Sequence, residues 1–231
     1  MKRWFLDELE YAGRENLDPA HVEHYDEKED ADAAREVALL KGLGLGPESI
    51  VVEFGPGTGQ FTVEVAPECA QVIAVDISRL MLERLRNKVA DRHLSNIEVV
   101  QAGFLTYQHE LGPADFIYSR FALHHLPDFW KAVTLDRLLR ILRPGGYFRL
   151  WDVVYNFDPH QAEERIEAWC SAYDEGGESE WGRADLEEHV RDEHSTFTWV
   201  LEPMIQRSGF EIIDAEHSDE GVFSKYLLRA A

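Results

Sequence analysis

The residues with the clearest chemical potential lie where an apolar run meets a glycine-rich turn. The run Ile50–Phe54 leads into Gly55-Pro56-Gly57-Thr58-Gly59, and we expect a strand that passes through this turn into a helix from about Thr58. Glycines allow a ligand to approach the backbone closely, because a Cβ would obstruct it. Three glycines at alternating positions are more than a tight turn requires, so we predict that the turn holds a ligand.

The details of this turn favour a ligand with an amino-acid end over a dinucleotide. The dinucleotide fingerprint Gly-x-Gly-x-x-Gly presents backbone N–H groups to a pyrophosphate. Here the third glycine comes one residue early, Gln60 takes its usual place, and Pro56 removes one N–H. Glu53 would repel a pyrophosphate, but it could accept hydrogen bonds from an amino group. A nicotinamide-dependent oxidoreductase is therefore the disfavoured alternative.

A second acid follows the next apolar run. Asp76 ends the run Val72–Val75 and lies 21 residues beyond Gly55. A carboxylate at that place can accept hydrogen bonds from both hydroxyls of a ribose, and Ile77 could pack against an adenine face. The alternative is an acid that only stabilises a helix N-terminus beside Ser78. Its position behind the glycine turn favours the ribose interpretation.

Two adjacent histidines follow the fourth apolar run. We expect one of His124 and His125 to face a substrate as a base or orienting group, and the other to fix the loop, because neighbouring side chains point to different sides. Asp152 is a further candidate for either kind of role. The structural alternative is that all three only hold the loop through hydrogen bonds.

Two other chemistries find little support. His21 and His24 have a spacing that two helical metal ligands could share, but His189 and His194 do not, and the chain has no His-Glu-x-x-His motif. We therefore expect no metal site. A serine hydrolase is also unsupported, because no Gly-x-Ser-x-Gly turn follows a strand.

Short apolar runs that alternate with helical patterns indicate an α/β domain with a parallel sheet covered on both faces. Ser78 and Asp128 are predicted to cap helices, and Pro144-Gly145 to end the second of them. The predicted strands are Ile50–Phe54, Val72–Val75, Ile97–Val100, Phe116–Tyr118, Tyr147–Val154, Phe210–Ala215 and Val222–Leu228.

We expect a single domain over residues 1–231. A helical N-terminal lid would cover 1–48, a donor-binding core 49–155, a cap insertion 156–200, and a closing helix and strands 201–231. The cap should be helical and lie over the acceptor pocket. Its candidate wall residues are the aromatic side chains Trp169, Tyr173, Trp181, Phe197 and Trp199.

Composition sets limits on partners. The chain has 44 acidic residues against 23 Lys and Arg, a net charge of −21, which disfavours nucleic acid as a partner. No apolar stretch approaches the roughly 20 residues that span a membrane, and the N-terminus lacks a signal-peptide pattern. Two cysteines cannot form a disulfide framework. We expect a cytoplasmic protein without a membrane partner, and the sequence is compatible with a homodimer.

With these features in place, the chain resembles the class I S-adenosylmethionine-dependent methyltransferases of the small-molecule type. The resemblance rests on four segments in the family's order, Glu53–Gly59, Val75–Ser78, Ala114–Leu126 and Leu142–Tyr147. It implies a doubly wound, mostly parallel seven-stranded sheet with the last strand antiparallel, S-adenosylmethionine as donor and a small-molecule methyl acceptor. The implied donor-site residues are Tyr25, Glu53, Gly55, Pro56, Gly57, Gly59, Asp76, Ile77, Met81, Gly103, Phe104 and Ser119.

The chain departs from this pattern at one place. Many relatives carry Gly-Asp after the third strand, where the Asp accepts a hydrogen bond from the adenine amino group. The corresponding segment here is Gln101-Ala102-Gly103-Phe104, which has no acid. Adenine recognition must then use the backbone near Gly103 and Phe104, or another side chain. The missing acid also keeps open a partner subunit that binds the donor without using it.

Overall fold

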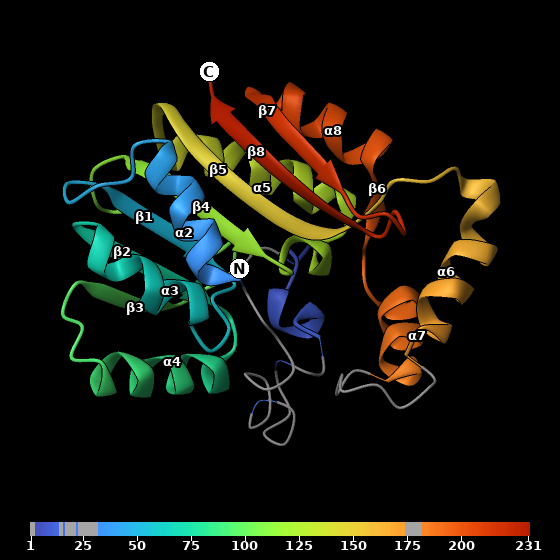
Figure 1. The fold of residues 1–231 in the computed structure, drawn as a ribbon, viewed down its shortest axis with the longest axis horizontal. Helices are drawn as coiled ribbons and strands as arrows, with labels where there is room; N and C mark the ends of the chain where they lie inside the picture. Colours follow the sequence, from blue (N-terminus) through green and yellow to red (C-terminus); the bar gives the residue numbers. More distant parts are fainter. Residues whose placement is uncertain (1–2, 14–15, 17–21, 23–31, 174–181) are drawn as a thin grey trace.

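A computed structural model describes residues 3–13, 16, 22, 32–173 and 182–231, and it shows an α/β fold around one mixed sheet (Figure 1). The seven main strands lie in the order β3-β2-β1-β4-β5-β8-β7, and a short strand, β6, pairs with the end of β5. The strands are β1 (Ile50–Phe54), β2 (Gln71–Asp76), β3 (Ile97–Gln101), β4 (Ala114–Arg120), β5 (Leu142–Tyr155), β6 (Thr196–Phe197), β7 (Phe210–His217) and β8 (Phe223–Ala230).

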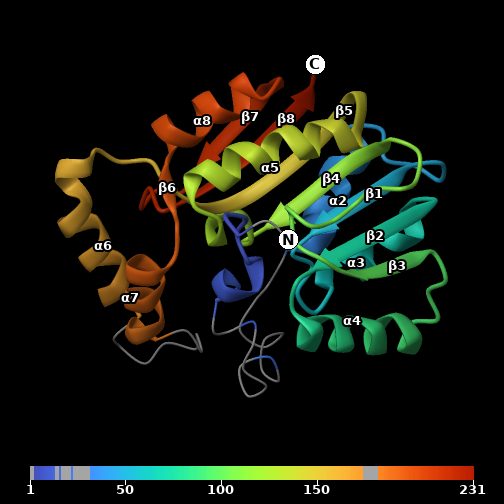
Figure 2. The same ribbon diagram turned by 180° about the vertical axis from the view of Figure 1, so that it is seen from behind.

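Helices cover both faces of the sheet. Helices α2, α3 and α4 pack on one face, and α5 and α8 on the other (Figures 1 and 2). None of the helices in the described residues is long and apolar enough to cross a membrane. The α-helices are α2 (Ala33–Gly42), α3 (Gln60–Val65), α4 (Arg79–Asp91), α5 (Asp128–Ile141), α6 (Ala162–Ser171), α7 (Arg183–Asp192) and α8 (Thr198–Arg207). Single 3-10 turns are η1 (Glu8–Tyr11), η3 (Ala66–Glu68), η4 (Leu123–His125) and η5 (Pro159–Gln161).

The topology confirms the predicted fold class. Strands β3, β2, β1, β4 and β5 are parallel, whereas β8 runs antiparallel to both β5 and β7. Alternation within the strands explains the continuous apolar runs. Val51 packs under α2 and α3, and Val52 packs in the core below α5, because neighbouring residues of a strand face opposite sides.

One predicted helix cap is wrong. Asp128 is the first residue of α5 and Pro127 stands at the cap position, so Asp128 makes no capping hydrogen bond. Its carboxylate instead pairs with Lys131, at 2.9 Å between Oδ1 and Nζ. The cap predicted at Ser78 is confirmed, since its Oγ accepts from the Met81 N–H at 3.2 Å.

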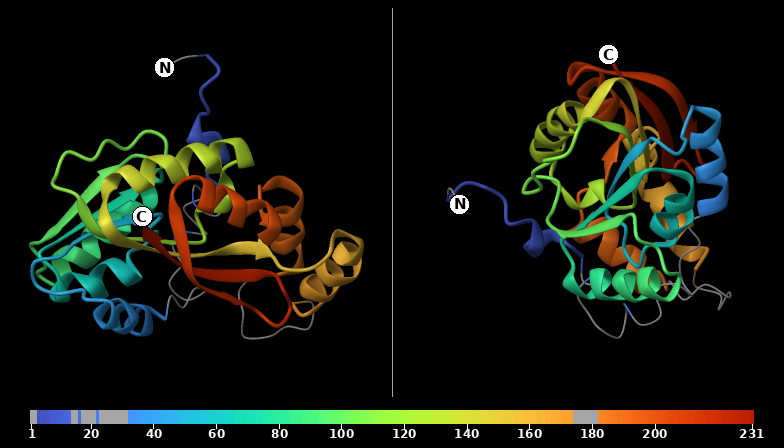
Figure 3. Two further views of the ribbon diagram at one scale, coloured as in Figure 1. Left: turned by 90° about the horizontal axis from the view of Figure 1, so that it is seen from above. Right: turned by 90° about the vertical axis from the view of Figure 1, so that its left-hand side faces the viewer.

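Two helices, α6 and α7, project beyond the end of β5 (Figures 1 and 3). Trp169 packs in a separate core with Tyr155 and Val222, and Tyr173 and Phe197 pack against it. Trp199 is 60% exposed, and Trp181 lies outside the described residues. The described aromatic residues of this segment therefore do not form the predicted pocket wall, because they are needed to hold the two helices to the sheet.

A buried ion pair ties α2 to the middle of the sheet. The guanidinium of Arg149 on β5 contacts the Glu36 carboxylate at 2.7 Å and 3.1 Å, and both side chains are 2% exposed. Such two-point contacts satisfy charges that would be costly to bury alone. The position of α2 over β1 and β4 therefore depends on a matched pair of charges as well as on apolar packing.

We predict that Glu36→Gln lowers the free energy of unfolding by about 3–5 kcal/mol, because it leaves the buried Arg149 charge without its partner. Chemical denaturation measures this loss. The control is Asp136→Asn, which removes an ion pair with Arg140 that is 2.8 Å long but exposed, and should change stability by less than about 0.5 kcal/mol. Equal effects of the two variants would contradict the prediction.

Candidate functional site

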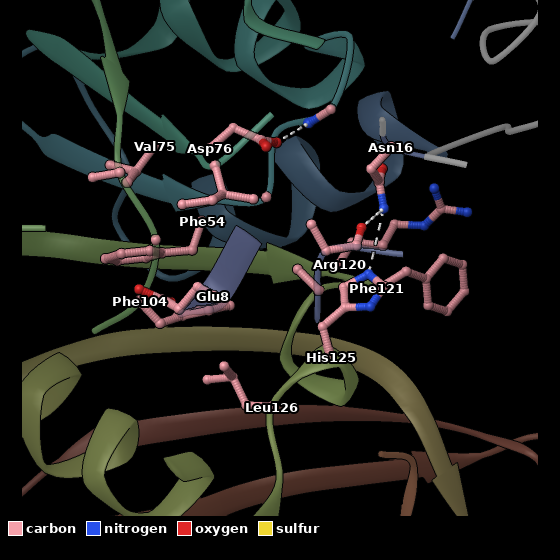
Figure 4. Close-up of a pocket in the computed structure, with 17 residues that line it drawn as sticks. Glu8, Asn16, Phe54, Val75, Asp76, Phe104, Arg120, Phe121, His125 and Leu126 are labelled. Atoms are coloured by element: carbon pink, nitrogen blue, oxygen red, sulfur yellow. Dashed lines mark hydrogen bonds between the residues drawn. The ribbon is translucent and has the colours of Figure 1, made fainter. Parts of the chain in front are cut away.

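A pocket of about 630 Å³ opens at the carboxyl ends of β1, β2, β3 and β4 (Figure 4). Open α/β sheets place their ligands at this edge. The N-terminal segment crosses the pocket, so its walls come from parts of the chain that are far apart in sequence. The lining residues are Glu8, Ala12, Asn16, Phe54, Gly55, Gly57, Val75, Asp76, Ile77, Ala102, Gly103, Phe104, Arg120, Phe121, Ala122, His125 and Leu126.

The three glycines of the turn have different surroundings. Gly55 and Gly57 line the pocket, with φ of 70° and 53° that favour glycine. A Cβ on Gly55 would lie 2.4 Å from the Cβ of Ala122. Gly59 lies outside the pocket lining, where a Cβ would meet the Leu85 side chain at 2.2 Å. Gly59 thus serves the packing of α4, and the other two glycines shape the pocket.

Asp76 holds the turn and faces the pocket. One of its oxygens accepts from the Gly57 N–H at 3.1 Å and the other from the Ser78 N–H at 2.7 Å. Burial raises the pKa of Asp76 to about 6, although these N–H donors oppose the shift. The Ile77 N–H also donates to this carboxylate, so three donors leave about one of its four acceptor positions for a hydroxyl group.

Glu53 lies beneath the turn and not in the pocket lining. Its carboxylate accepts a hydrogen bond from the Thr62 hydroxyl at 2.5 Å and is 3% exposed. Burial raises the pKa of Glu53 to about 8, and the negative charge of Asp76 adds to the shift. The structure therefore places Glu53 under the glycine turn, where it supports α3. In this geometry Glu53 does not contact an amino group in the pocket directly.

The other predicted donor-site residues divide into two groups. Ile77, Gly103 and Phe104 line the pocket, and Phe104 stacks on Phe54 with ring centroids 4.9 Å apart. The remaining four lie elsewhere. Pro56 is in the turn but not in the lining, Met81 and Ser119 are completely buried, and Tyr25 lies outside the described residues.

The two histidines have opposite environments. His124 is buried between two carboxylates, with Nδ1 hydrogen-bonded to Asp152 and Nε2 at 3.0 Å from Glu193. Although burial alone would lower it, these carboxylates raise the pKa of His124 to about 10. His124 is therefore an imidazolium at neutral pH. It fixes the loop after β4 and does not line the pocket.

His125 lines the pocket. Its Nε2 lies 3.5 Å from the side-chain amide of Asn16. Burial and the nearby charge of His124 lower the pKa of His125 to about 3, so its ring is neutral at physiological pH. A neutral imidazole can accept or donate a hydrogen bond, but with this pKa it is a weak base.

Among the described residues, His124, His125 and Glu193 offer atoms that all lie within 4.8 Å of one another, which a metal ion could bridge. His189 belongs to the same cluster, with Nδ1 at 2.6 Å from Glu193. A metal ion would have to displace the hydrogen-bonded ion pairs that already use these atoms. The sequence spacing of His189 and His194 does not predict this cluster. The cluster forms because His124 and His189 both contact Glu193.

Ten of the lining residues were not among the predicted site residues, and Glu8, Asn16, Arg120 and Phe121 are among them. The guanidinium of Arg120 lies 4.5 Å from the ring centroids of both Phe121 and Trp151. Phe121 has a φ of 50°, which is unusual for a bulky residue, and its N–H donates to the Trp151 carbonyl at 2.9 Å. Arg120 ends β4 and Phe121 follows it. The sequence places both at the ligand-binding edge of the sheet, although neither was assigned a role. Glu8 and Asn16 carry no comparable signal.

Comparison with known proteins agrees with this geometry. A family model described as a methyltransferase domain matches residues 51–146. An uncharacterized methyltransferase of Geobacillus kaustophilus is 28% identical over 218 residues, 94% of each chain.

Two solved structures share the fold. A SAM-dependent methyltransferase from Aquifex aeolicus superposes with a TM-score of 0.64 at 16% identity, over 93% of this chain and 100% of that chain. The N-methyltransferase NodS from Bradyrhizobium japonicum, in complex with S-adenosyl-L-homocysteine, gives 0.60 at 15% identity over 86% of each chain.

The sheet order and the matches together define a Rossmann-like methyltransferase. The chain contains a methyltransferase domain, matched over residues 51–146, and S-adenosylmethionine is its methyl donor. The pocket fits that donor. It combines open backbone at Gly55 and Gly57, a carboxylate at Asp76 and an apolar wall at Ile77 and Phe104.

The charge of His124 makes stability depend on pH. The pKa of His124 is about 10 in the folded state, against an ordinary value of 6.5. Its contribution to the free energy of unfolding is therefore complete below pH 6.5 and is lost as pH rises through 10. The pKa values of Asp152 and Glu193 are lowered against the effect of burial, chiefly by His124. Their contributions are present above pH 4.5 and are lost on acidification.

We therefore predict that the stability advantage of the wild type over His124→Gln declines between pH 6.5 and 10, by at most about 1.4 kcal/mol per pH unit for one proton. Denaturation curves at stepped pH measure this. The exposed His160 gives the control variant, His160→Gln, which should follow the wild type throughout. A constant difference between wild type and His124→Gln would show that His124 is not charged in the folded protein.

Proposed function

We propose that this enzyme transfers a methyl group from S-adenosylmethionine to a small-molecule acceptor bound in the same pocket. The observation that carries the proposal is one continuous pocket with Asp76 at one side and Phe121 and His125 at the other (Figure 4). The N-terminal segment narrows the opening, which favours a small acceptor over a macromolecule.

The donor side would use the residues at the ends of β1, β2 and β3. Asp76 would accept a hydrogen bond from a ribose hydroxyl, and Ile77 and Phe104 would pack against the adenine. Gly55 and Gly57 would leave room for the amino-acid end beside the turn. Glu53, Gly59 and Met81 would support this side from beneath, since they are buried behind the lining.

The acceptor side would work by position. The donor supplies an activated methyl group on a sulfonium, so the chain has to align the acceptor atom and exclude water. His125, as a neutral imidazole beside Asn16, would orient the acceptor through a hydrogen bond. His124 would act through the loop, because its ring is occupied by Asp152 and Glu193.

The flanking segments would complete the pocket as lid and cap. Within residues 1–48, the part that carries Glu8, Ala12 and Asn16 would form the lid, because these residues line the pocket, whereas α2 packs on the face of the sheet. Residues 156–200 would form the cap, because Glu193 and the N–H of His194 contact His124, the latter at 3.0 Å to its carbonyl. The cap would then influence which acceptor binds, because it contacts the loop that carries His125. The aromatic core of the cap would hold the cap in place.

We predict that Asp76→Asn raises the Kd for S-adenosylhomocysteine about 10- to 100-fold, because a charge-assisted hydrogen bond is worth about 1.5–3 kcal/mol. Asparagine preserves the shape and one acceptor oxygen, so the fold should survive. Calorimetric titration measures the Kd, and Asp91→Asn, at the exposed end of α4, is the control. An unchanged Kd in Asp76→Asn would remove Asp76 from the donor site.

A second prediction concerns His125. An acceptor is first identified by incubating the enzyme and S-adenosylmethionine with pools of small metabolites and measuring the S-adenosylhomocysteine that forms. His125→Gln should then lower kcat/KM about 3- to 10-fold, the worth of a neutral hydrogen bond. The melting temperature and the shape of the pH–rate profile should stay unchanged, because a group with a pKa near 3 does not titrate in that range. Loss of an inflection near pH 6–7 in the variant would instead assign base catalysis to His125.

A further inference from the structure

Glu8 is an acid buried in the wall of the donor pocket. It begins η1, is 7% exposed, and lies beside Phe54 and Phe104 in Figure 4, on the side of the pocket away from Phe121. Among the described residues that line the pocket, the acids are Glu8 and Asp76. Burial raises the pKa of Glu8, so its position carries an electrostatic cost that needs a reason.

The carboxylate of Glu8 occupies the space that a side chain at residue 103 would take. A Cβ built on Gly103 would lie 2.3 Å from Oε1 and 2.5 Å from Oε2 of Glu8. Such distances are far below van der Waals contact, so only glycine is compatible with Glu8 at this point. The segment Gln101–Phe104 has no acid of its own, but a carboxylate supplied by the N-terminal segment lies beside it.

Neighbouring groups hold this carboxylate but do not saturate it. The Leu105 N–H lies 3.1 Å from one oxygen and 3.2 Å from the other, and the Thr106 hydroxyl donates to Oε2 at 3.2 Å. Thr106 is itself fixed by the Gly103 N–H at 2.8 Å. The Phe104 N–H also donates to this carboxylate. Three protein donors for about four acceptor positions leave one position for a donor in the pocket.

The order of the strands indicates which part of the methyl donor meets Glu8. Asp76 ends β2, the glycine turn follows β1, and the loop of Gly103 follows β3 on the other side of β2. If the ribose lies at Asp76 and the amino-acid end lies toward the turn and β4, the base must extend toward β3. A purine there would have its faces against apolar side chains and its amino edge at Glu8.

We propose that Glu8 recognises the adenine of S-adenosylmethionine by accepting a hydrogen bond from its exocyclic amino group. Glu8 thereby replaces the acid that the segment Gln101–Phe104 lacks, and Gly103 is the residue that makes room for it. This inference rests on the proposed donor site. It makes the N-terminal segment part of the donor site, so that the adenine and η1 stabilise each other when the donor binds.

The test compares two nucleosides that differ on this edge of the base. S-adenosylhomocysteine presents a 6-amino donor and an unprotonated N1, whereas S-inosylhomocysteine presents a 6-oxo group, which a carboxylate repels, and an N1–H. Glu8→Gln should raise the Kd for the adenosyl compound about 10- to 100-fold. It should lower the preference for adenosyl over inosyl at least about tenfold, because the glutamine amide can donate to the oxo group. Glu10→Gln, exposed on the same turn, is the control and should leave both affinities unchanged.

A second variant separates recognition from support of the fold. Glu8→Ala should lose the preference for adenosyl, and Glu8→Ala combined with Gly103→Asp should recover it, because the second acid grows from the loop into the vacated space. An equal loss of both nucleosides in Glu8→Gln, with no recovery in the double variant, would overturn the proposal and leave Glu8 a structural residue. Asp76→Asn reports separately on the donor site, so weaker binding there together with unchanged preference in Glu8→Gln would overturn the role of Glu8 alone.

Discussion

The pocket depends on the ionic contact between Asp152 and His124. The Asp152 carboxylate, on β5, accepts the N–H groups of Leu123 and His124 at 2.8 Å and 3.2 Å and hydrogen-bonds the His124 ring. The other side of that ring contacts Glu193, just beyond α7. One imidazolium thus joins the sheet, the loop after β4 and the segment that follows α7. Burial, together with the charge of this imidazolium, lowers the pKa of the neighbouring His125 and keeps its ring neutral, which decides what chemistry the pocket can offer.

A buried carboxylate organises the other side of the pocket in the same way. Asp76 at the end of β2 accepts the N–H of Gly57 from the turn after β1 and the N–H of Ser78 from its own loop. Loops at the carboxyl edge of a parallel sheet expose backbone N–H groups that need acceptors. Acids on strands therefore position the loops that bind ligands, at the cost of burying charge, and each charge is offset by hydrogen bonds or an ion pair.

The sequence predicted what depends on local pattern. The seven main strands, the glycine turn, Asp76 and the cap at Ser78 follow from apolar runs and turn residues that lie next to one another in the chain. It could not predict contacts made across long separations. Glu193 reaches His124 and Asn16 reaches His125 only after the sheet has brought their segments together. For Glu53, the sequence predicted its place beside the turn but not the direction of its side chain. That direction depends on the hydrogen bond with Thr62 in α3.

The N-terminal segment is the element that touches both sides of the pocket. Through Glu8 it meets the loop after β3, and through Asn16 it meets Ser78, whose hydroxyl donates to the Asn16 carbonyl at 2.5 Å, as well as His125. A ligand that fills the donor side must therefore contact a segment that also borders the acceptor side. If donor and acceptor lie as proposed, both would contact this short stretch of chain. Its position would then affect the binding of both ligands and couple the two without movement of the sheet.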